Sequence, residues 1–359
     1  MKIVLAFDSF KGGMSAAQAC RAAASGIRQV CGDVETVELP MSDGGEGLVE
    51  CVRRIVPVVE RDVVVSGPLM TPVKARYALS PDGTTAYMEM AAAAGLSLVP
   101  PDMRNPLLAT TCGVGEMMAD AMGVGCDTIV MGIGGSATCD GGRGMIEALE
   151  RAGRMDTTCR IVAACDVSNP LYGENGAACV FAPQKGATPG QVKVLDRRLR
   201  EFARLTEHAG MATPELAHHP GAGAAGGLGY ALLAWLHARL CPGIDIMMDL
   251  AGFDEVVRDA DLVITGEGKS DCQTLMGKVA HGVSRRCKRQ GIGVWLLSGL
   301  IDDCDGRLAN NFSLVESINR GDARRVDTLM KPEVAMENMR RTISRLFEAY
   351  CRDGLIDKS

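Results

Sequence analysis

The chain has few aromatic residues and lacks long apolar runs, and each shortage excludes a class of protein. Aromatic residues make up 4% of its 359 residues, which argues against an aromatic-rich binding surface. No apolar run approaches the roughly 20 residues that span a bilayer. The opening MKIVLAF is too short for the apolar core of a secretory signal. We therefore expect a cytoplasmic protein without a membrane partner.

Basic blocks, paired cysteine motifs and histidine clusters are also missing. Lys and Arg together number 38 against 44 Asp and Glu, and no basic segment stands out, so nucleic acid is not an expected partner. The 14 cysteines include no CxxC pair, which favours reduced, mostly buried side chains over disulfides or zinc ligands. The five histidines form one pair, His218-His219, which fits a polar loop before Pro220 better than a metal site.

Short apolar strands and Ala-rich helices alternate along much of the chain. Residues 2–7 and 34–39 read as strands, and Ser15 with Gln18 predicts a capping box at the start of the helix between them. Residues 57–90 instead contain three short strands close together. The alternation returns later, and residues 261–297 resemble the opening units.

This pattern predicts an α/β protein with two α/β domains. One is a discontinuous flavodoxin- or Rossmann-like parallel-sheet domain, formed by residues 1–65 and 250–359. The other is an inserted mixed α/β domain, formed by residues 66–249.

The segment GIGGSATCDGG, from Gly132 to Gly142, follows the buried strand predicted at residues 127–131. Its glycines let backbone N–H groups converge into an anion-binding nest, and a following helix N-terminus adds partial positive charge. Ser136 and Asp140 lie in the same loop. The sequence therefore predicts a phosphate site with a carboxylate suited to a divalent cation beside it.

Four other loops share this mixture of Asp, Ser, Lys and Gly after a strand or turn. In open α/β sheets ligands bind beyond the carboxyl ends of the strands, where such loops gather, although each loop alone is also explained by ordinary turn chemistry. These loops are residues 8–11, 42–46, 166–170 and 266–271.

Phosphoryl transfer is the chemistry that best fits this set of loops. It requires N–H nests, cations and carboxylates for Mg²⁺, whereas acyl transfer would require a nucleophile elbow, and no G-x-S-x-G occurs. Gly268-Lys269-Ser270 imitates the end of a Walker A motif, but Val263 occupies the position of its first glycine.

A dinucleotide fingerprint remains an alternative interpretation of two glycine-rich segments. The loop Gly132–Ala137 follows a strand, so an NAD(P)-dependent oxidoreductase stays open. Gly221-x-Gly223-x-x-Gly226 follows no strand, and tight helix packing explains it as well as phosphate contact does.

Eight motifs occur in a characteristic order along the chain: AFDSFKGGMSA, SDGGEG, MEMAAAAGL, GIGGSATCDGG, ACDVSNPLYG, FAPQKGA, GAGAAGG and ITGEGKSD. In this order they resemble the bacterial glycerate kinase family of the glycerate 2-kinase type. The resemblance runs from Met1 to about Gly299 and implies ATP- and Mg²⁺-dependent phosphorylation of D-glycerate, usually to 2-phosphoglycerate, in organic acid and glyoxylate catabolism. It also implies an active site in the cleft between two α/β domains.

The chain departs from the family between Glu150 and Arg160, where it is shorter by a Gly-rich loop and the segment that follows. A kinase relative with altered or lost acceptor specificity therefore stays a further alternative. The expected partners are D-glycerate and a nucleotide, and we expect a monomer or homodimer.

The resemblance and the loop chemistry together suggest roles for individual residues. We expect Asp140 and Asp166 to bind Mg²⁺, with Asp166 among the catalytic residues, and Lys11 to contact the transferred phosphoryl group or the glycerate carboxylate. Asp43 and Asp271 would hold acceptor hydroxyls, although both also suit helix caps. The expected phosphate-binding residues are Gly134, Gly135, Ser136, Gly141, Gly142, Gly221, Gly223 and Gly226.

Overall fold

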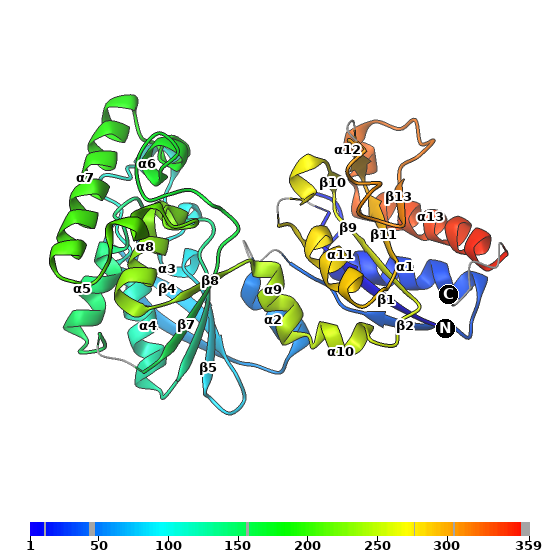
Figure 1. The fold of residues 1–359 in the computed structure, drawn as a ribbon, viewed down its shortest axis with the longest axis horizontal. Coiled ribbons are helices and arrows are strands. Elements are labelled where there is room, and N and C mark those ends of the chain that lie inside the picture. Colours follow the sequence, from blue (N-terminus) through cyan, green and yellow to red (C-terminus); the bar gives the residue numbers. More distant parts are fainter. Residues whose placement is uncertain (11, 43–46, 156–157, 276, 304–305, 353–359) are drawn as a thin grey trace. The chain divides into compact units, whose positions relative to one another are not determined.

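The structure is a computed structural model that describes residues 1–10, 12–42, 47–155, 158–275, 277–303 and 306–352. The chain forms two compact units, which we describe separately (Figure 1). Unit 1 comprises Met1–Asp43 and Met247–Ser359, and unit 2 comprises Gly44–Ile246.

Residues 44–65 belong to unit 2, whereas the sequence-based boundary placed them with the first domain. The reason is strand pairing, because β3 (Val59–Ser66) pairs along its whole length with β4 (Pro72–Leu79). That the two units are domains able to fold alone stays a prediction.

Unit 1 is built on a five-stranded sheet in which every neighbouring pair is parallel. The strand order is β13-β11-β9-β1-β2, which in order of appearance along the chain is the 2-1-3-4-5 order of flavodoxin-like folds. The fold class predicted from the sequence is therefore confirmed for this unit. The strands are β1 (Lys2–Phe7), β2 (Glu35–Glu38), β9 (Leu262–Gly266), β11 (Val294–Ser298) and β13 (Leu314–Ser317).

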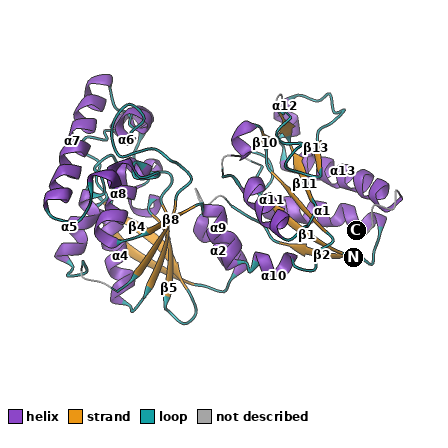
Figure 2. Ribbon diagram, in the orientation of Figure 1, coloured by secondary structure: helices purple, strands orange, loops and turns teal. Residues whose placement is uncertain are grey.

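Helices cover both faces of this sheet (Figure 2). Ile3, Leu5 and Phe7 of β1 point into the core formed with α1 and α13, which pack against each other. The Ser15–Gln18 capping box at the start of α1 is confirmed. The helices of unit 1 are α1 (Ala16–Val30), α10 (Phe253–Val257), α11 (Val279–Arg289), α12 (Val326–Leu329) and α13 (Pro332–Arg352). Two short strands, β10 (Lys269–Ser270) and β12 (Leu300–Ile301), pair beside the sheet.

Unit 2 contains a six-stranded mixed sheet in the order β3-β4-β5-β6-β7-β8. The pairs β3–β4 and β4–β5 are antiparallel, as the cluster of short strands predicted, and the later pairs are parallel. The remaining strands are β5 (Thr85–Glu89), β6 (Thr128–Gly132), β7 (Arg160–Ala164) and β8 (Arg239–Cys241).

The helices of unit 2 enclose a core rich in Ala, Met and Leu. They are α2 (Leu48–Ile55), α3 (Ala91–Ala94), α4 (Cys112–Gly123), α5 (Arg143–Arg151), α6 (Ala177–Phe181), α7 (Pro189–His208) and α8 (Ala224–Leu236). The chain returns to unit 1 within α9 (Gly243–Leu250). Within the described ranges, no helix has the length and apolar character needed to cross a membrane.

Candidate functional site

The loop after β6 is held by residues of the MEMAAAAGL motif. The backbone N–H of Leu96 donates to the Gly135 carbonyl at 2.8 Å, and that of Ala137 donates to the Ala94 carbonyl at 2.9 Å. Gly135 adopts a φ of +71°, a conformation that glycine reaches without strain. The N–H groups of Gly134, Gly135 and Ser136 donate to no atom of the residues that the structure describes. This arrangement suits an anion-binding nest.

A buried lysine lies beneath this loop. The Lys185 ammonium donates to Ser136 Oγ and to the Thr138 carbonyl, each at 2.7 Å. Burial lowers the pKa of Lys185 to about 8, although Cys139 and Asp140 act in the opposite direction. The sequence analysis assigned no role to this lysine of the FAPQKGA motif, because a sequence does not show that a lysine is buried.

Asp140 is an anchor between the starts of two helices. Its Oδ2 accepts from the Thr111 backbone N–H and the Thr111 hydroxyl, both at 2.8 Å, and from the Gly144 N–H at 3.2 Å. Its Oδ1 accepts from the Gly142 N–H at 3.2 Å. Thr111 is the N-cap of α4 and Gly142 is the N-cap of α5. Four donors match the roughly four lone-pair sites of a carboxylate, so metal binding at Asp140 would compete with these bonds.

Asp166 lies in the next loop along the same sheet edge. Gly132 at the end of β6 pairs with Ala164 at the end of β7, so the two loops leave the sheet side by side. Asp166 is exposed, and its Oδ1 accepts from the Gly243 N–H at 3.1 Å. Asp166 is therefore a more exposed residue than Asp140, which is half-buried.

The segment from Gly221 to Gly227 packs against both of these loops. A Cβ on Gly223 would lie 2.2 Å from the Pro170 carbonyl oxygen, and one on Gly226 would lie 2.0 Å from that of Thr138. A Cβ on Gly221 would lie 2.9 Å from Cys165 Sγ. These contacts support the tight-packing interpretation, and phosphate contact by these glycines stays a prediction.

Gly141 and Gly142 have φ angles of +72° and +81°. A Cβ on Gly141 would meet Phe202, and one on Gly142 would meet Ala231 at 2.4 Å. Both positions therefore need glycine for the fold, and their phosphate-binding role likewise stays a prediction.

Unit 1 has its own polar loops at the point where the strand order reverses, between β1 and β9. In flavodoxin-like sheets this switch point is where ligands bind. The Asp8 N–H donates to the Gly266 carbonyl at 2.9 Å, which joins the two loops. Lys11 and Asp43 lie outside the described residues, so their predicted roles have no structural description.

Glu267 organises the loop of residues 266–271 from a buried position. Its Oε1 accepts from the Thr274 hydroxyl at 2.6 Å and the Ser270 hydroxyl at 3.1 Å, and Lys278 lies 3.4 Å from its Oε2. The sequence analysis did not single out this carboxylate among the turn residues. A carboxylate with this many donors is well placed to hold the loop in one conformation.

Asp271 caps the short 3₁₀ turn that follows it. Its Oδ1 accepts from the Gln273 N–H at 2.9 Å, while its own N–H donates to the Thr274 hydroxyl at 3.0 Å. An ion pair at 3.0 Å with Lys269 lowers the pKa of Asp271. The N-cap interpretation fits this geometry, and binding of an acceptor hydroxyl stays a prediction.

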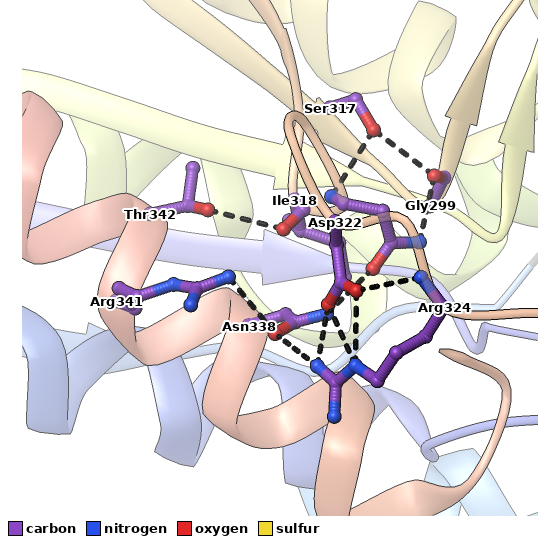
Figure 3. Close-up of polar contacts among 9 residues, drawn as sticks. Gly299, Ser317, Ile318, Asp322, Arg324, Asn338, Arg341 and Thr342 are labelled. Atoms are coloured by element: carbon purple, nitrogen blue, oxygen red, sulfur yellow. Dashed lines mark hydrogen bonds and ion pairs between the residues drawn. The ribbon is translucent and has the colours of Figure 1, made fainter. Parts of the chain in front are cut away.

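A network from the C-terminal helix supports the same loop (Figure 3). The Asn319 side chain and the Ser317 hydroxyl donate to the Gly299 carbonyl at 2.9 and 3.0 Å. The buried Asn338 of α13 donates to Asn319 Oδ1 at 2.9 Å and to Asp322 at 3.1 Å. Because the Gly299 N–H donates to the Glu267 carbonyl at 3.2 Å, the network reaches the loop of residues 266–271.

A cluster of three or more metal-ligating side chains does not occur in the described part of the chain. The His218-His219 pair belongs to the residues searched and is part of no such cluster. His219 Nδ1 lies 2.7 Å from the Pro220 carbonyl oxygen. Mg²⁺ needs no such cluster, because it is commonly bound by one or two carboxylates together with substrate phosphates.

Comparison with known proteins gives one consistent family. A model of the glycerate kinase family matches residues 3–152 and 150–348, so the match continues well beyond Gly299. A glycerate kinase from Halalkalibacterium halodurans is 43% identical over 324 residues, covering 83% of this chain and 85% of the relative. A glycerate 2-kinase from Escherichia coli K12 is 41% identical over 330 residues, covering 84% and 86%.

A solved structure agrees over the full length. The crystal structure of a protein assigned as glycerate kinase 2 from Salmonella typhimurium LT2 has a TM-score of 0.83 and 37% sequence identity, and it covers 99% of both chains. The chain therefore belongs to the glycerate kinase family and is a phosphotransferase of the kinase class.

Proposed function

We propose that this protein transfers the γ-phosphoryl group of ATP to D-glycerate, with Mg²⁺, and that 2-phosphoglycerate is the favoured product. The observation that carries this proposal is the loop Gly134–Ser136, whose three N–H groups donate to no atom of the described residues and which contacts the buried Lys185 ammonium. The choice of glycerate as the acceptor is supported by the relatives named glycerate kinase and glycerate 2-kinase. Organic acid or glyoxylate catabolism in the cytoplasm is the expected setting.

In the proposed reaction a glycerate hydroxyl oxygen forms a new bond to the γ-phosphorus. The bond from that phosphorus to the β–γ bridging oxygen breaks, and ADP leaves with the electron pair. The hydroxyl proton passes to a carboxylate, for which the exposed Asp166 is the leading candidate. The protein contributes mainly positioning and electrostatic stabilisation.

Mg²⁺ would neutralise charge on the phosphates when bound. Asp166 is an exposed residue that a metal ion can reach, whereas Asp140 would have to give up some of its four hydrogen bonds to bind one. We therefore favour Asp166 as the protein ligand and keep Asp140 as the residue that fixes the loop. Lys11, Asp43 and Asp271 stay candidates for holding glycerate.

The position of the shortened connection supports an unaltered acceptor. This connection joins α5 to β7, and Arg160 at the start of β7 pairs with Thr128 at the start of β6. It therefore lies at the amino edge of the sheet, whereas Asp140 and Asp166 lie at the carboxyl edge. The two segments that the family model matches also overlap at residues 150–152, where α5 ends.

The oxidoreductase alternative is disfavoured by the loop after β6. In a dinucleotide-binding unit the helix opens directly within the glycine fingerprint. Here α5 begins only at Arg143, after a nest and the Asp140 anchor.

An ADP-release assay tests the proposed function. Purified protein with ATP and Mg²⁺ should release ADP with D-glycerate, and more slowly with tartronate or sugar acids. Adding enolase without a mutase identifies the product, because enolase acts on 2-phosphoglycerate and not on the 3-isomer. Equal turnover without D-glycerate, or reduction of NAD(P)⁺ by glycerate, would contradict the proposal.

A further inference from the structure

Lys185 is a buried cation. The residue is 3% exposed, and within the described ranges its ammonium donates to the Ser136 hydroxyl and the Thr138 carbonyl and to no carboxylate. Burying an unpaired charge is costly, which is why such groups usually have a partner or a function. The cost is visible in the lowered pKa of Lys185, about 8.

The backbone around Lys185 holds it rigidly. It ends the 3₁₀ turn Pro183–Lys185, and its N–H donates to the Ala182 carbonyl at 3.0 Å. Gly186 follows with a φ of +93°, where a Cβ would lie 2.7 Å from the Arg104 carbonyl oxygen. The backbone from which the Lys185 side chain extends therefore has one well-defined conformation.

Hydrogen-bond chemistry then fixes the direction of the Ser136 hydroxyl. An ammonium can only donate, so Ser136 Oγ must be the acceptor in its 2.7 Å bond with Lys185. The hydroxyl proton of Ser136 is consequently directed away from Lys185. This hydroxyl belongs to the same loop as the N–H groups of Gly134, Gly135 and Ser136, which have no acceptor among the residues that the structure describes.

We propose that Lys185 is a positioning residue for nucleotide binding: its ammonium fixes the Ser136 hydroxyl as a donor to a phosphate oxygen and places a positive charge beneath the nest. This inference rests on the proposed phosphate site and deepens it. A bound phosphate would offset the cost of burying the cation. Lys185 itself touches neither the phosphate nor the acceptor.

A purely structural lysine gives a different expectation. In that case removal of the ammonium lowers stability, but its effect on nucleotide affinity is independent of Ser136. The positioning role predicts that Lys185 and Ser136 are energetically coupled in ATP binding, and the structural role predicts that they are not. A double-mutant cycle measures this coupling.

The experiment compares Ser136→Ala, Lys185→Met and the double variant with the wild-type full-length chain. Lys193→Met, which removes an exposed lysine of α7, is the matched control. Affinity for ATP with Mg²⁺ is measured by titration calorimetry without glycerate, alongside kcat, KM and thermal midpoints. We expect about 10-fold weaker ATP binding for Ser136→Ala and about 30-fold for Lys185→Met.

The double variant should resemble Lys185→Met, because the hydroxyl loses its orientation once the ammonium is gone. Ser136→Thr, which keeps a hydroxyl, should recover much of the affinity that Ser136→Ala loses. Affinity within 2-fold of wild type for either single variant, or fully multiplicative effects in the double variant, would overturn the inference.

If Lys185→Met fails to fold, proton uptake on ATP binding by the wild-type protein tests the same inference. A bound phosphate should raise the pKa of Lys185. Its titratable neighbours are the Asp140 carboxylate and the Cys139 thiol, and burial raises the pKa of Cys139 to about 11, so this thiol is neutral at pH 8.5. ATP binding at pH 8.5 should then take up protons, measured in buffers of different ionisation enthalpy, and absence of uptake would overturn the inference. ATP binding without glycerate turnover would contradict the proposed function and leave this inference intact.

Discussion

At the scale of single residues, the sequence is enough to locate the polar loops, whereas the contacts of their side chains are seen only in the structure. Ser136, Asp140 and Asp166 could be proposed as site residues because glycine-rich loops after strands are visible in the local sequence, and their roles stay predictions. The bond between Asp140 and Thr111, 29 residues apart, could not be predicted, because it depends on how α4 and α5 pack. Lys185 and Glu267 were missed for the same reason, since burial arises only in the folded chain.

Asp140 and Asp166 should differ sharply in their effect on stability. Asp140→Ala leaves three backbone N–H groups and a hydroxyl without an acceptor, so the free energy of unfolding should fall by about 2–3 kcal/mol. Asp166→Ala should change it by less than about 1 kcal/mol, because Asp166 is exposed. Urea denaturation followed by circular dichroism compares them, and equal losses would refute the anchor role of Asp140.

The same Asp166→Ala variant should nevertheless lose turnover. We expect kcat to fall by a factor of about 100 or more, since a magnesium ligand or proton acceptor would be removed. Glu147→Ala, which removes an exposed carboxylate from α5, is the control and should keep normal kinetics. Near-normal turnover of Asp166→Ala would remove the catalytic assignment.

At the scale of elements, sequence rules predicted the start of a helix correctly where contacts within one turn determine it. The Ser15–Gln18 capping box opens α1 as predicted, because all of its atoms lie within one turn. The apolar helix α8 ends at Leu236, because β8 pairs with β7 and takes the following residues into the sheet. The role of the segment from Gly221 to Gly227 could not be chosen from the sequence, because its packing against loops far away in the chain is not visible in the local sequence.

Gly226 tests the packing role of that segment. It has a φ of +71°, and its Cβ would overlap the Thr138 carbonyl, so Gly226→Ala should lower the free energy of unfolding by more than about 2 kcal/mol. Gly190→Ala in the first turn of α7 is the control, because its Cβ would meet nothing within 4 Å. That variant should be neutral or slightly stabilising, and similar losses in both would contradict the packing account.

The network around α13 predicts a pH dependence of stability. Hydrogen bonding to Arg324 holds the pKa of Asp322 well below its usual range. Because the pKa is lower in the folded state, the stability that this carboxylate contributes is present above its unfolded pKa of about 3.9. It is lost as the pH falls through the folded pKa.

Asp322→Asn should therefore be less stable than wild type at pH 7, and the difference should shrink as the pH falls below about 4. Urea midpoints at a series of pH values measure this difference. A constant difference across the series would show that Asp322 does not act through its charge.

At the scale of the whole molecule, alternation of strands and helices was enough to predict the fold class. The flavodoxin-like strand order of unit 1, in contrast, is seen only in the pairing of its strands, because a Rossmann-like order has the same alternation. The assignment of residues 44–65 to unit 2 was not predictable, because it rests on pairing of β3 with β4. The place of the shortened connection, at the amino edge of the sheet in unit 2, likewise emerged only from strand register.

The most direct test of the whole account is the acceptor specificity of the purified protein in the presence of ATP and Mg²⁺. We expect kcat/KM for D-glycerate to exceed that for tartronate and sugar acids by at least about 100-fold. Enolase should convert the product directly. Absence of ADP release with D-glycerate, while another acid serves well, would contradict the account.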